Sequence, residues 1–160
     1  MYIQPGSIAI LESTMAQELL HSTEPAQFAY VWTDGTPRVV PIWFAWNGSA
    51  LVVSSPPTAP KVNVLRRNPA VAVTINTSIP PYKVLLIRGH AEVELVDGIP
   101  PEYVSSARHY FGEEQGAAWC NQVDKLFSQM ARILIRPTWA EVHDFQNRFP
   151  KAIADAMAGG

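Results

Sequence analysis

The chain has 160 residues, of which 48% are apolar and 16% are charged, and its net charge is −2. This length is typical of one domain with its own hydrophobic core, so we expect a single domain over residues 1–160. The lack of a basic excess argues against nucleic acid and membrane surfaces as partners. A low charge content leaves more apolar surface to cover, which favours a homo-oligomer.

Cysteine and histidine usage argues against two kinds of site. The single Cys120 forms no internal disulfide, and its apolar neighbours in AAWCNQV indicate a buried small side chain rather than a catalytic thiol. The four histidines are scattered without the spacing of metal ligands, so we expect no metal site. We find no signal-peptide pattern and no apolar stretch long enough to cross a bilayer, and we expect a cytoplasmic protein.

The first part of the chain predicts one short helix followed by strands in hairpins. Apolar side chains have helical spacing in residues 12–22. Strands are predicted at residues 28–32, 38–46 and 50–54. Turn signals at Asp34-Gly35 and Asn47-Gly48 separate them. Tight turns make successive strands antiparallel neighbours, so we expect the strand that starts at Arg38 to pair with 50–54.

The rest of the chain predicts further strands around short helices. Helices are predicted at residues 60–67, in two pieces within 101–130 and in the tail around 150–158. Strands are predicted at residues 71–75, 84–96, 132–135 and 139–145. Gly89 is expected at a bulge, Gly112 at the break between the two central helices, and Pro137 between the last two strands. Six or seven antiparallel strands with only short helices predict a mainly β fold, a small barrel. Barrels of this size hold either side chains or one small ligand.

The segment from Ser54 to Lys61 has the composition of an anion site. A strand ends in Ser54-Ser55, Thr58 follows, and a helix begins close to Lys61. The free N–H groups of a first helical turn attract anions, and a lysine there is otherwise unfavourable beside the positive end of the helix dipole. The alternative is that Thr58 only caps the helix and Lys61 points into water. Spacing alone does not separate these two interpretations.

The strand RVVPIW is the second candidate segment. Pro41 has no N–H group to donate, which places this strand at a sheet edge or a bulge, where a ligand can approach the backbone. Arg38 either reaches the same anion or is a solvated charge at the strand end. Trp43 either forms a wall for a planar ring or packs in the core.

A turn, a proline-bearing strand, a hairpin, a strand that ends in hydroxyls and a helix that begins near a lysine follow one another in TDGTPRVVPIWFAWNGSALVVSSPPTAPKVNVLRRNPAVAVTI. With its signals in this order, the stretch resembles the core of the pyridoxamine 5'-phosphate oxidase-like, FMN-binding split-barrel superfamily. The later RGHAEVE, residues 88–94, is similar to another strand of that family. The resemblance spans roughly residues 8–145 and leaves 146–160 as a tail. It implies an antiparallel split β-barrel of six to seven strands, a homodimer with cofactor sites at the subunit interface, and a flavin-dependent oxidoreductase that acts on a small organic substrate.

The resemblance also implies which residues hold the cofactor. In the family, the lysine and hydroxyls of this segment bind the phosphate of FMN, and the proline-bearing strand runs under the isoalloxazine ring. The predicted cofactor-binding residues are Arg38, Val39, Val40, Pro41, Ile42, Trp43, Ser54, Ser55, Thr58 and Lys61. No catalytic residue is predicted.

Departures from the family pattern leave alternatives for the function. The strand RVVPIW lacks the second basic residue of true pyridoxamine phosphate oxidases, which disfavours vitamin B6 oxidation. It is more similar to branches that use FMN or the deazaflavin coenzyme F420. The first alternative is therefore an F420-dependent reductase on the same fold. The second is a non-catalytic protein that binds or stores flavin or haem.

Overall fold

The computed structural model describes residues 4–159, so the ends of the predicted 1–160 domain, 1–3 and 160, lie outside it. Seven strands form one antiparallel sheet in the order β2-β1-β5-β6-β7-β4-β3. The strands are β1 (Ala26–Val31), β2 (Pro37–Ile42), β3 (Ala45–Trp46), β4 (Leu51–Ser55), β5 (Ala70–Asn76), β6 (Val84–Asp97) and β7 (Gln129–His143). This confirms the predicted mainly β fold, although the sheet stays open between its two edge strands, β2 and β3.

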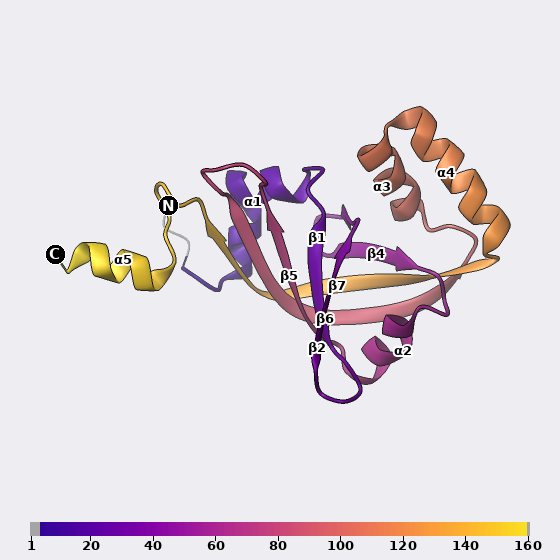
Figure 1. Cartoon of the computed structure of the whole chain (residues 1–160), viewed down its shortest axis with the longest axis horizontal. Helices are drawn as coiled ribbons and strands as arrows, with labels where there is room; N and C mark the ends of the chain where they lie inside the picture. Colours follow the sequence, from indigo (N-terminus) through magenta and orange to yellow (C-terminus); the bar gives the residue numbers. More distant parts are fainter. Residues whose placement is uncertain (1–3, 160) are drawn as a thin grey trace.

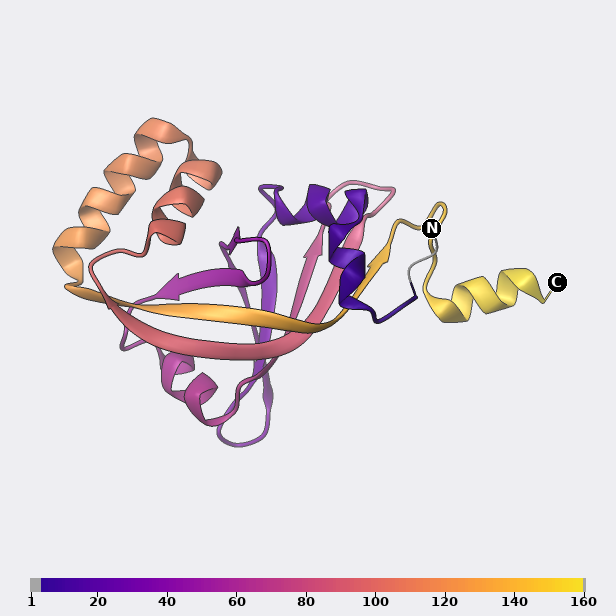
Figure 2. The ribbon, with the colours of Figure 1, turned by 180° about the vertical axis from the view of Figure 1, so that it is seen from behind.

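Short helices lie on both sides of this curved sheet and at its ends (Figure 1). They are the 3-10 helix η1 (Ile8–Glu12), which the sequence analysis missed, and the α-helices α1 (Thr14–Leu20), α2 (Pro60–Arg67), α3 (Pro101–Phe111), α4 (Glu113–Leu126) and α5 (Lys151–Ala158). Figure 2 shows from behind that α3 and α4 form a hairpin at one end of the long β6–β7 ribbon, whereas α5 projects at the other end. No helix within residues 4–159 is long and apolar enough to cross a membrane.

The chain does not follow the predicted meander between β2 and β4. β2 ends at Ile42 and pairs with β1, whereas β4 pairs with β7 and with the two-residue strand β3. Trp43 and Phe44 carry the chain from one sheet edge to the other, because Phe44 is buried in the core and Trp43 packs against α3. The expected pairing of Arg38 with residues 50–54 is therefore wrong, since the strand ends where Phe44 is buried in the core and Trp43 turns to pack against α3. The edge position predicted from Pro41 is confirmed.

Pro137 does not divide the last strand, contrary to the expectation. β7 is continuous from Gln129 to His143, and Pro137 lies opposite Gly89, where the register shifts at a bulge. At a bulge one residue is left out of the ladder, so a proline without an N–H group is tolerated there. A Cβ atom on Gly89 would lie 2.0 Å from the Arg136 carbonyl oxygen, which confirms the predicted close contact at this glycine.

The hydrophobic core lies between the concave face of the sheet and the segment that contains η1 and α1. Its largest fully buried side chains include Phe28 of β1, Leu85 of β6 and Ile135 of β7. Leu19 of α1 packs into the same cluster, and Met15 lies at its margin. The apolar face predicted for this helix therefore closes the core. Gly112 separates α3 from α4 as predicted.

Candidate functional site

A cleft of about 390 Å³ lies where the ends of β2 and β4 meet the first turn of α2 and one face of α3. Its lining residues are Pro25, Pro41, Ile42, Trp43, Val52, Val53, Ser54, Ser55, Lys61, Tyr103 and Ser106. The two segments singled out in the sequence therefore meet, although their strands are not neighbours in the sheet.

Six of the ten predicted residues line this cleft, namely Pro41, Ile42, Trp43, Ser54, Ser55 and Lys61. The other four are Arg38, Val39, Val40 and Thr58, and they lie outside its lining. Thr58 is exposed, and it does not cap α2, because the N-cap residue is Ala59 and no side chain caps this helix. The alternative that made Thr58 a helix cap is therefore wrong.

Arg38 is engaged at the β1–β2 turn rather than at the cleft. Its Nη1 atom donates a hydrogen bond of 2.8 Å to Thr36 Oγ1, and its Nη2 atom lies 4.0 Å from a carboxylate oxygen of Asp34. The guanidinium group also lies 5.6 Å from the ring centroid of Trp32. Within one protomer the structure does not bring Arg38 and Lys61 together, because β2 pairs with β1 and not with β4.

The polar end of the cleft combines a partly buried cation with an unused hydroxyl group. Lys61 makes no ion pair with any residue in 4–159 and is the one charged side chain of the lining in that range. Burial lowers the pKa of its ammonium group. Ser54 Oγ is shielded from solvent and has no hydrogen-bond partner there. Buried charges and hydroxyls are costly without partners, so this end of the cleft is complementary to an anion.

Another part of the cleft lining is aromatic. Trp43 is stacked on Tyr110 of α3, with ring centroids 5.7 Å apart and an interplanar angle of 12°. Phe111 meets Trp43 edge to face at 4.7 Å, and Tyr103 lies 6.3 Å from it. Trp43 therefore lines the cleft and packs against a helix rather than in the core cluster, and its role as a wall for a planar ring stays a prediction.

The helix α3 supplies two lining residues that the sequence analysis missed, Tyr103 and Ser106. They are three positions apart and so share a helix face. Ser106 is buried, but its neighbours include the polar Ser105 and Arg108, so nothing in the sequence marks this face as part of a site.

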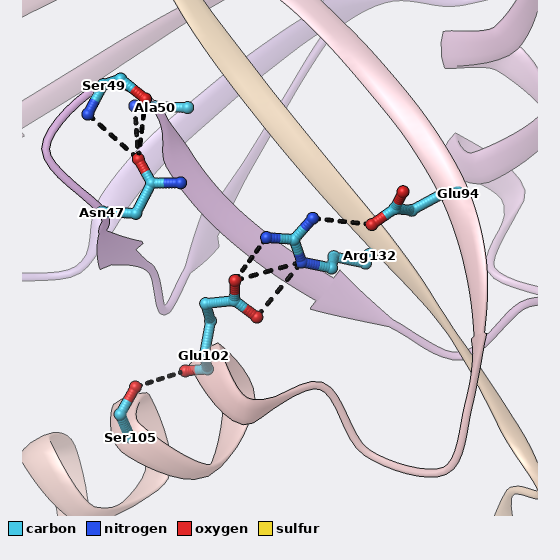
Figure 3. Close-up of polar contacts among 7 residues, drawn as sticks. All are labelled: Asn47, Ser49, Ala50, Glu94, Glu102, Ser105 and Arg132. Atoms are coloured by element: carbon cyan, nitrogen blue, oxygen red, sulfur yellow. Dashed lines mark hydrogen bonds and ion pairs between the residues drawn. The ribbon is translucent and has the colours of Figure 1, made fainter.

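An ion-pair cluster fastens α3 to the sheet beside the cleft (Figure 3). Arg132 of β7 lies opposite Ser54 in the ladder and binds Glu102 of α3 through Nε and Nη2. Its Nη1 atom donates to Glu94 of β6 at 2.6 Å. The hydrogen bonds from Arg132 hold the pKa of Glu102 below its ordinary value. The cluster thus couples the start of α3 to the strand that supplies Ser54.

The turn that leads into β4 is fixed by its own side chain. Asn47 Oδ1 accepts hydrogen bonds from the backbone N–H groups of Ser49 and Ala50, at 3.0 and 2.8 Å (Figure 3). This is the Asx-type turn that the Asn-Gly pair predicts. It sets the register of β3 with β4, and hence the positions of Ser54 and Ser55 at the end of β4.

Neither a metal cluster nor a reactive thiol is found in the part of the chain that the structure describes. Residues 4–159 contain no group of three or more His, Cys, Asp or Glu side chains that could hold a metal ion. Cys120 is buried as predicted, and burial raises the pKa of its thiol. A higher pKa disfavours the nucleophilic thiolate, so the chemistry of the cleft rests on its lysine, hydroxyl and aromatic groups.

Comparison with known proteins gives a family match over most of the chain. The family model described as pyridoxamine 5'-phosphate oxidase matches residues 14–144. A search of curated proteins finds no match.

Solved structures with the same fold include proteins of several kinds. An F420 reductase is 29% identical, with a TM-score of 0.62 over 78% of this chain and 94% of that one. A putative pyridoxamine 5'-phosphate oxidase from Listeria innocua is 22% identical, with a TM-score of 0.56 over 80% of this chain and 94% of that one. The haem storage protein HutZ from Vibrio cholerae is 19% identical, with a TM-score of 0.57 over 79% and 90%.

Proposed function

Because the chain belongs to the pyridoxamine 5'-phosphate oxidase family, we propose that it binds a phosphorylated flavin or deazaflavin in the cleft and is an oxidoreductase. When bound, this cofactor would supply hydride transfer to or from a small organic substrate. The protein would supply the position of the rings and the electrostatic environment.

One observation carries this proposal. Lys61 and Ser54 line the same cleft, and within residues 4–159 neither the ammonium group nor the Ser54 hydroxyl has a partner. The first turn of α2 adds backbone N–H groups that no side chain caps. A phosphate group satisfies all three kinds of donor at once. The residues present therefore fit a phosphorylated cofactor.

The remaining lining fits the planar part of such a cofactor. Pro41, Ile42 and Trp43 come from the edge strand and the segment after it, where no further strand pairs with the backbone. Aromatic and aliphatic side chains on the same wall favour a flat conjugated ring by stacking and burial. The proposal assigns the phosphate to Lys61 and Ser54 and the ring to the Trp43 end.

Similarity to a solved structure favours F420 over FMN as the cofactor. An F420 reductase is 29% identical to this chain. We therefore place an F420-dependent reductase first and an FMN-dependent oxidoreductase second.

Parallel titrations of ligand-stripped protein with FMN and with F420, followed by fluorescence, test this proposal. Saturable binding of F420 with the lower Kd supports a deazaflavin-dependent reductase, and a lower Kd for FMN supports a flavin enzyme. Turnover of the bound reduced cofactor with a panel of conjugated electrophiles then separates an enzyme from a storage protein. Binding of neither cofactor would overturn the proposal.

Haem storage is a weaker candidate on this chain. The haem-binding neighbours are under 20% identical, which supports a common fold and no more. Haem iron is held in proteins by His, Cys, Met or Tyr, and of these the lining within residues 4–159 offers only Tyr103. Titration with haemin and the absence of a shifted Soret band would exclude this candidate.

The proposal includes a homodimer with the cleft at the subunit interface. The edge strand β2 leaves one side of its backbone without a partner, and its Val39 is 63% exposed. An exposed edge with an apolar side chain favours coverage by another chain. In a dimer, Arg38 and Val40 of the same strand could also reach a ligand across the interface. Light scattering on the purified protein measures the oligomeric state directly.

A further inference from the structure

The hydroxyl group of Tyr103 is the least explained polar group of the cleft. Tyr103 lies on the face of α3 that lines the cleft, close to Trp43. Its Oη atom accepts a hydrogen bond of 2.8 Å from the indole N–H of Trp119 on α4. The sequence analysis assigned no ligand-binding role to either Tyr103 or Trp119.

The chemistry of this contact fixes the direction of the bond. An indole N–H group can only donate, whereas a phenol can both donate and accept. Tyr103 is therefore the acceptor, and its own O–H hydrogen remains free to be donated. No residue within 4–159 accepts it, since the bond from Trp119 is the one hydrogen bond that the Tyr103 side chain makes there.

The surroundings keep Tyr103 a donor. Burial raises the pKa of its phenol, so the group stays protonated at neutral pH. Trp119 is itself supported by Phe111, whose ring centroid lies 6.2 Å away. The phenol is thus held by a neighbouring helix, beside an aromatic wall, and its hydrogen has no acceptor within residues 4–159.

We infer that Tyr103 donates a hydrogen bond to a conjugated carbonyl oxygen of the molecule bound in the cleft, and that Trp119 positions it for this contact. The inference rests on the proposed function for the nature of that molecule. A conjugated carbonyl is present in the pyrimidine ring of flavins and deazaflavins, and also in quinone or enone substrates. Tyr103 is then a residue that sets ligand specificity, since a ring without an acceptor at this place leaves a polar group of the site unpaired.

The substitution Tyr103→Phe tests the inference, and Tyr82→Phe is its matched control. Tyr82 lies outside the cleft lining and is 46% exposed, so the same loss of one phenol hydroxyl leaves the cleft intact. Each variant would be titrated with FMN, with F420 and with the phosphate-free quinone menadione. We expect Tyr103→Phe to raise one or more of these Kd values about 3- to 10-fold, the range for one neutral hydrogen bond, and Tyr82→Phe to leave them unchanged.

The three ligands separate the possible sources of the carbonyl. A raised Kd for FMN or F420, with a shifted absorption band of the bound ring, places the contact on the cofactor. A raised Kd for menadione alone places it on the substrate. Equal affinities of wild type and Tyr103→Phe for every ligand that binds would overturn the inference. If wild type binds neither cofactor, the proposed function fails, and menadione alone decides on Tyr103. If none of the three binds, both fail.

The positioning role of Trp119 has its own test. Trp119→Phe removes the indole donor but keeps an aromatic ring, and should weaken binding of the same ligand that Tyr103→Phe affects. The double variant should bind no more weakly than Tyr103→Phe alone, because Trp119 acts through the phenol. Additive losses would mean that Trp119 only supports the fold of the helical hairpin, and would overturn this part of the inference.

Discussion

Replacing Lys61 by methionine should make the ligand-free protein more stable and its binding of phosphorylated ligands weaker. Methionine keeps the length and much of the apolar stem of lysine and removes only the charge. In the folded protein the ammonium group is partly buried, has no ion-pair partner among the described residues, and has a pKa lowered by burial. A lysine with a structural role stabilises the ligand-free protein, whereas a buried lysine that serves only to bind a ligand destabilises it.

The expected changes in stability and in ligand affinity follow from the two effects of the Lys61 charge, one on folding and one on binding. Burial of a charge without a partner opposes folding, so we expect Lys61→Met to gain about 1 kcal/mol, or about 3 °C in Tm for a chain of this length. A charge-assisted hydrogen bond to phosphate is worth about 1.5–3 kcal/mol. Its loss should therefore raise the Kd for FMN or F420 about 10- to 150-fold.

The pH dependence of the Tm difference between Lys61→Met and wild type is a second test of the predicted stabilisation. The lysine is protonated in the unfolded chain up to its ordinary pKa of about 10.4, but the fold lowers this pKa. Protonation therefore costs the wild-type fold stability below its folded pKa, and the cost disappears as pH rises toward the unfolded value. The Tm advantage of Lys61→Met should be full at pH 7 and small near pH 10.5.

Thermal melts and ligand titrations on wild type and two variants complete the test. Lys83→Met is the matched control, because Lys83 lies outside the cleft lining and its Nζ atom is 2.5 Å from a carboxylate oxygen of Glu18. It should leave both Kd values unchanged. A Lys61→Met variant with a lower Tm and unchanged affinities would refute the reasoning, since Lys61 would then be a structural residue.

Three further substitutions probe the cleft and its support. Ser54→Ala should leave the Tm unchanged or raise it slightly, because it removes a buried hydroxyl group that has no partner in the ligand-free protein. It should raise the Kd for the phosphorylated ligand about 2- to 10-fold, through the loss of one hydrogen bond. Glu102→Gln should cost about 2 kcal/mol in urea unfolding at pH 7, through the lost ion pair with Arg132. Since the pKa of Glu102 is lowered in the fold, this difference should begin to shrink below its ordinary value of 4.5 and should vanish only once the pH is below the lowered pKa of the folded protein. Gly89→Ala should cost more than about 2 kcal/mol, because the new methyl group meets the Arg136 carbonyl oxygen; a cost below 0.5 kcal/mol would contradict the bulge geometry.

Local signals in the sequence predicted most of the strands and turns correctly. Asn47-Gly48 forms the hairpin between β3 and β4, and Gly89 lies at the bulge. Such signals act through the backbone conformation of one or two residues, so they are visible without the rest of the chain. Pro137 has the same local meaning, but its effect depends on the partner strand. Opposite the bulge its missing N–H group costs nothing, and β7 continues through it.

Long-range pairing was harder to predict than the elements themselves. The sequence order of β2, β3 and β4 favours a meander, yet β2 and β4 lie on opposite sides of β1, β5, β6 and β7 in the sheet. Burial of Phe44 in the core draws the chain across at this point. Because the pairing was wrong, Arg38 was expected close to Lys61, and the structure places it at the β1–β2 turn instead.

The part of the cleft that sequence reasoning missed is the part whose residues act only through contacts across the chain. Ser54 and Lys61 are seven positions apart and were predicted from one segment, but the role inferred for Tyr103 depends on Trp119, sixteen positions later, which donates to its oxygen. Neither residue alone differs from an ordinary aromatic side chain on a helix. The proposed phosphate contacts thus come from one short stretch of sequence. The proposed contacts to the ring depend instead on how α3 and α4 fold back on each other and on the Arg132–Glu102 ion pair that holds α3 to the sheet. Under the proposed function, related chains could therefore keep the phosphate contacts and alter ligand preference through this helical hairpin alone.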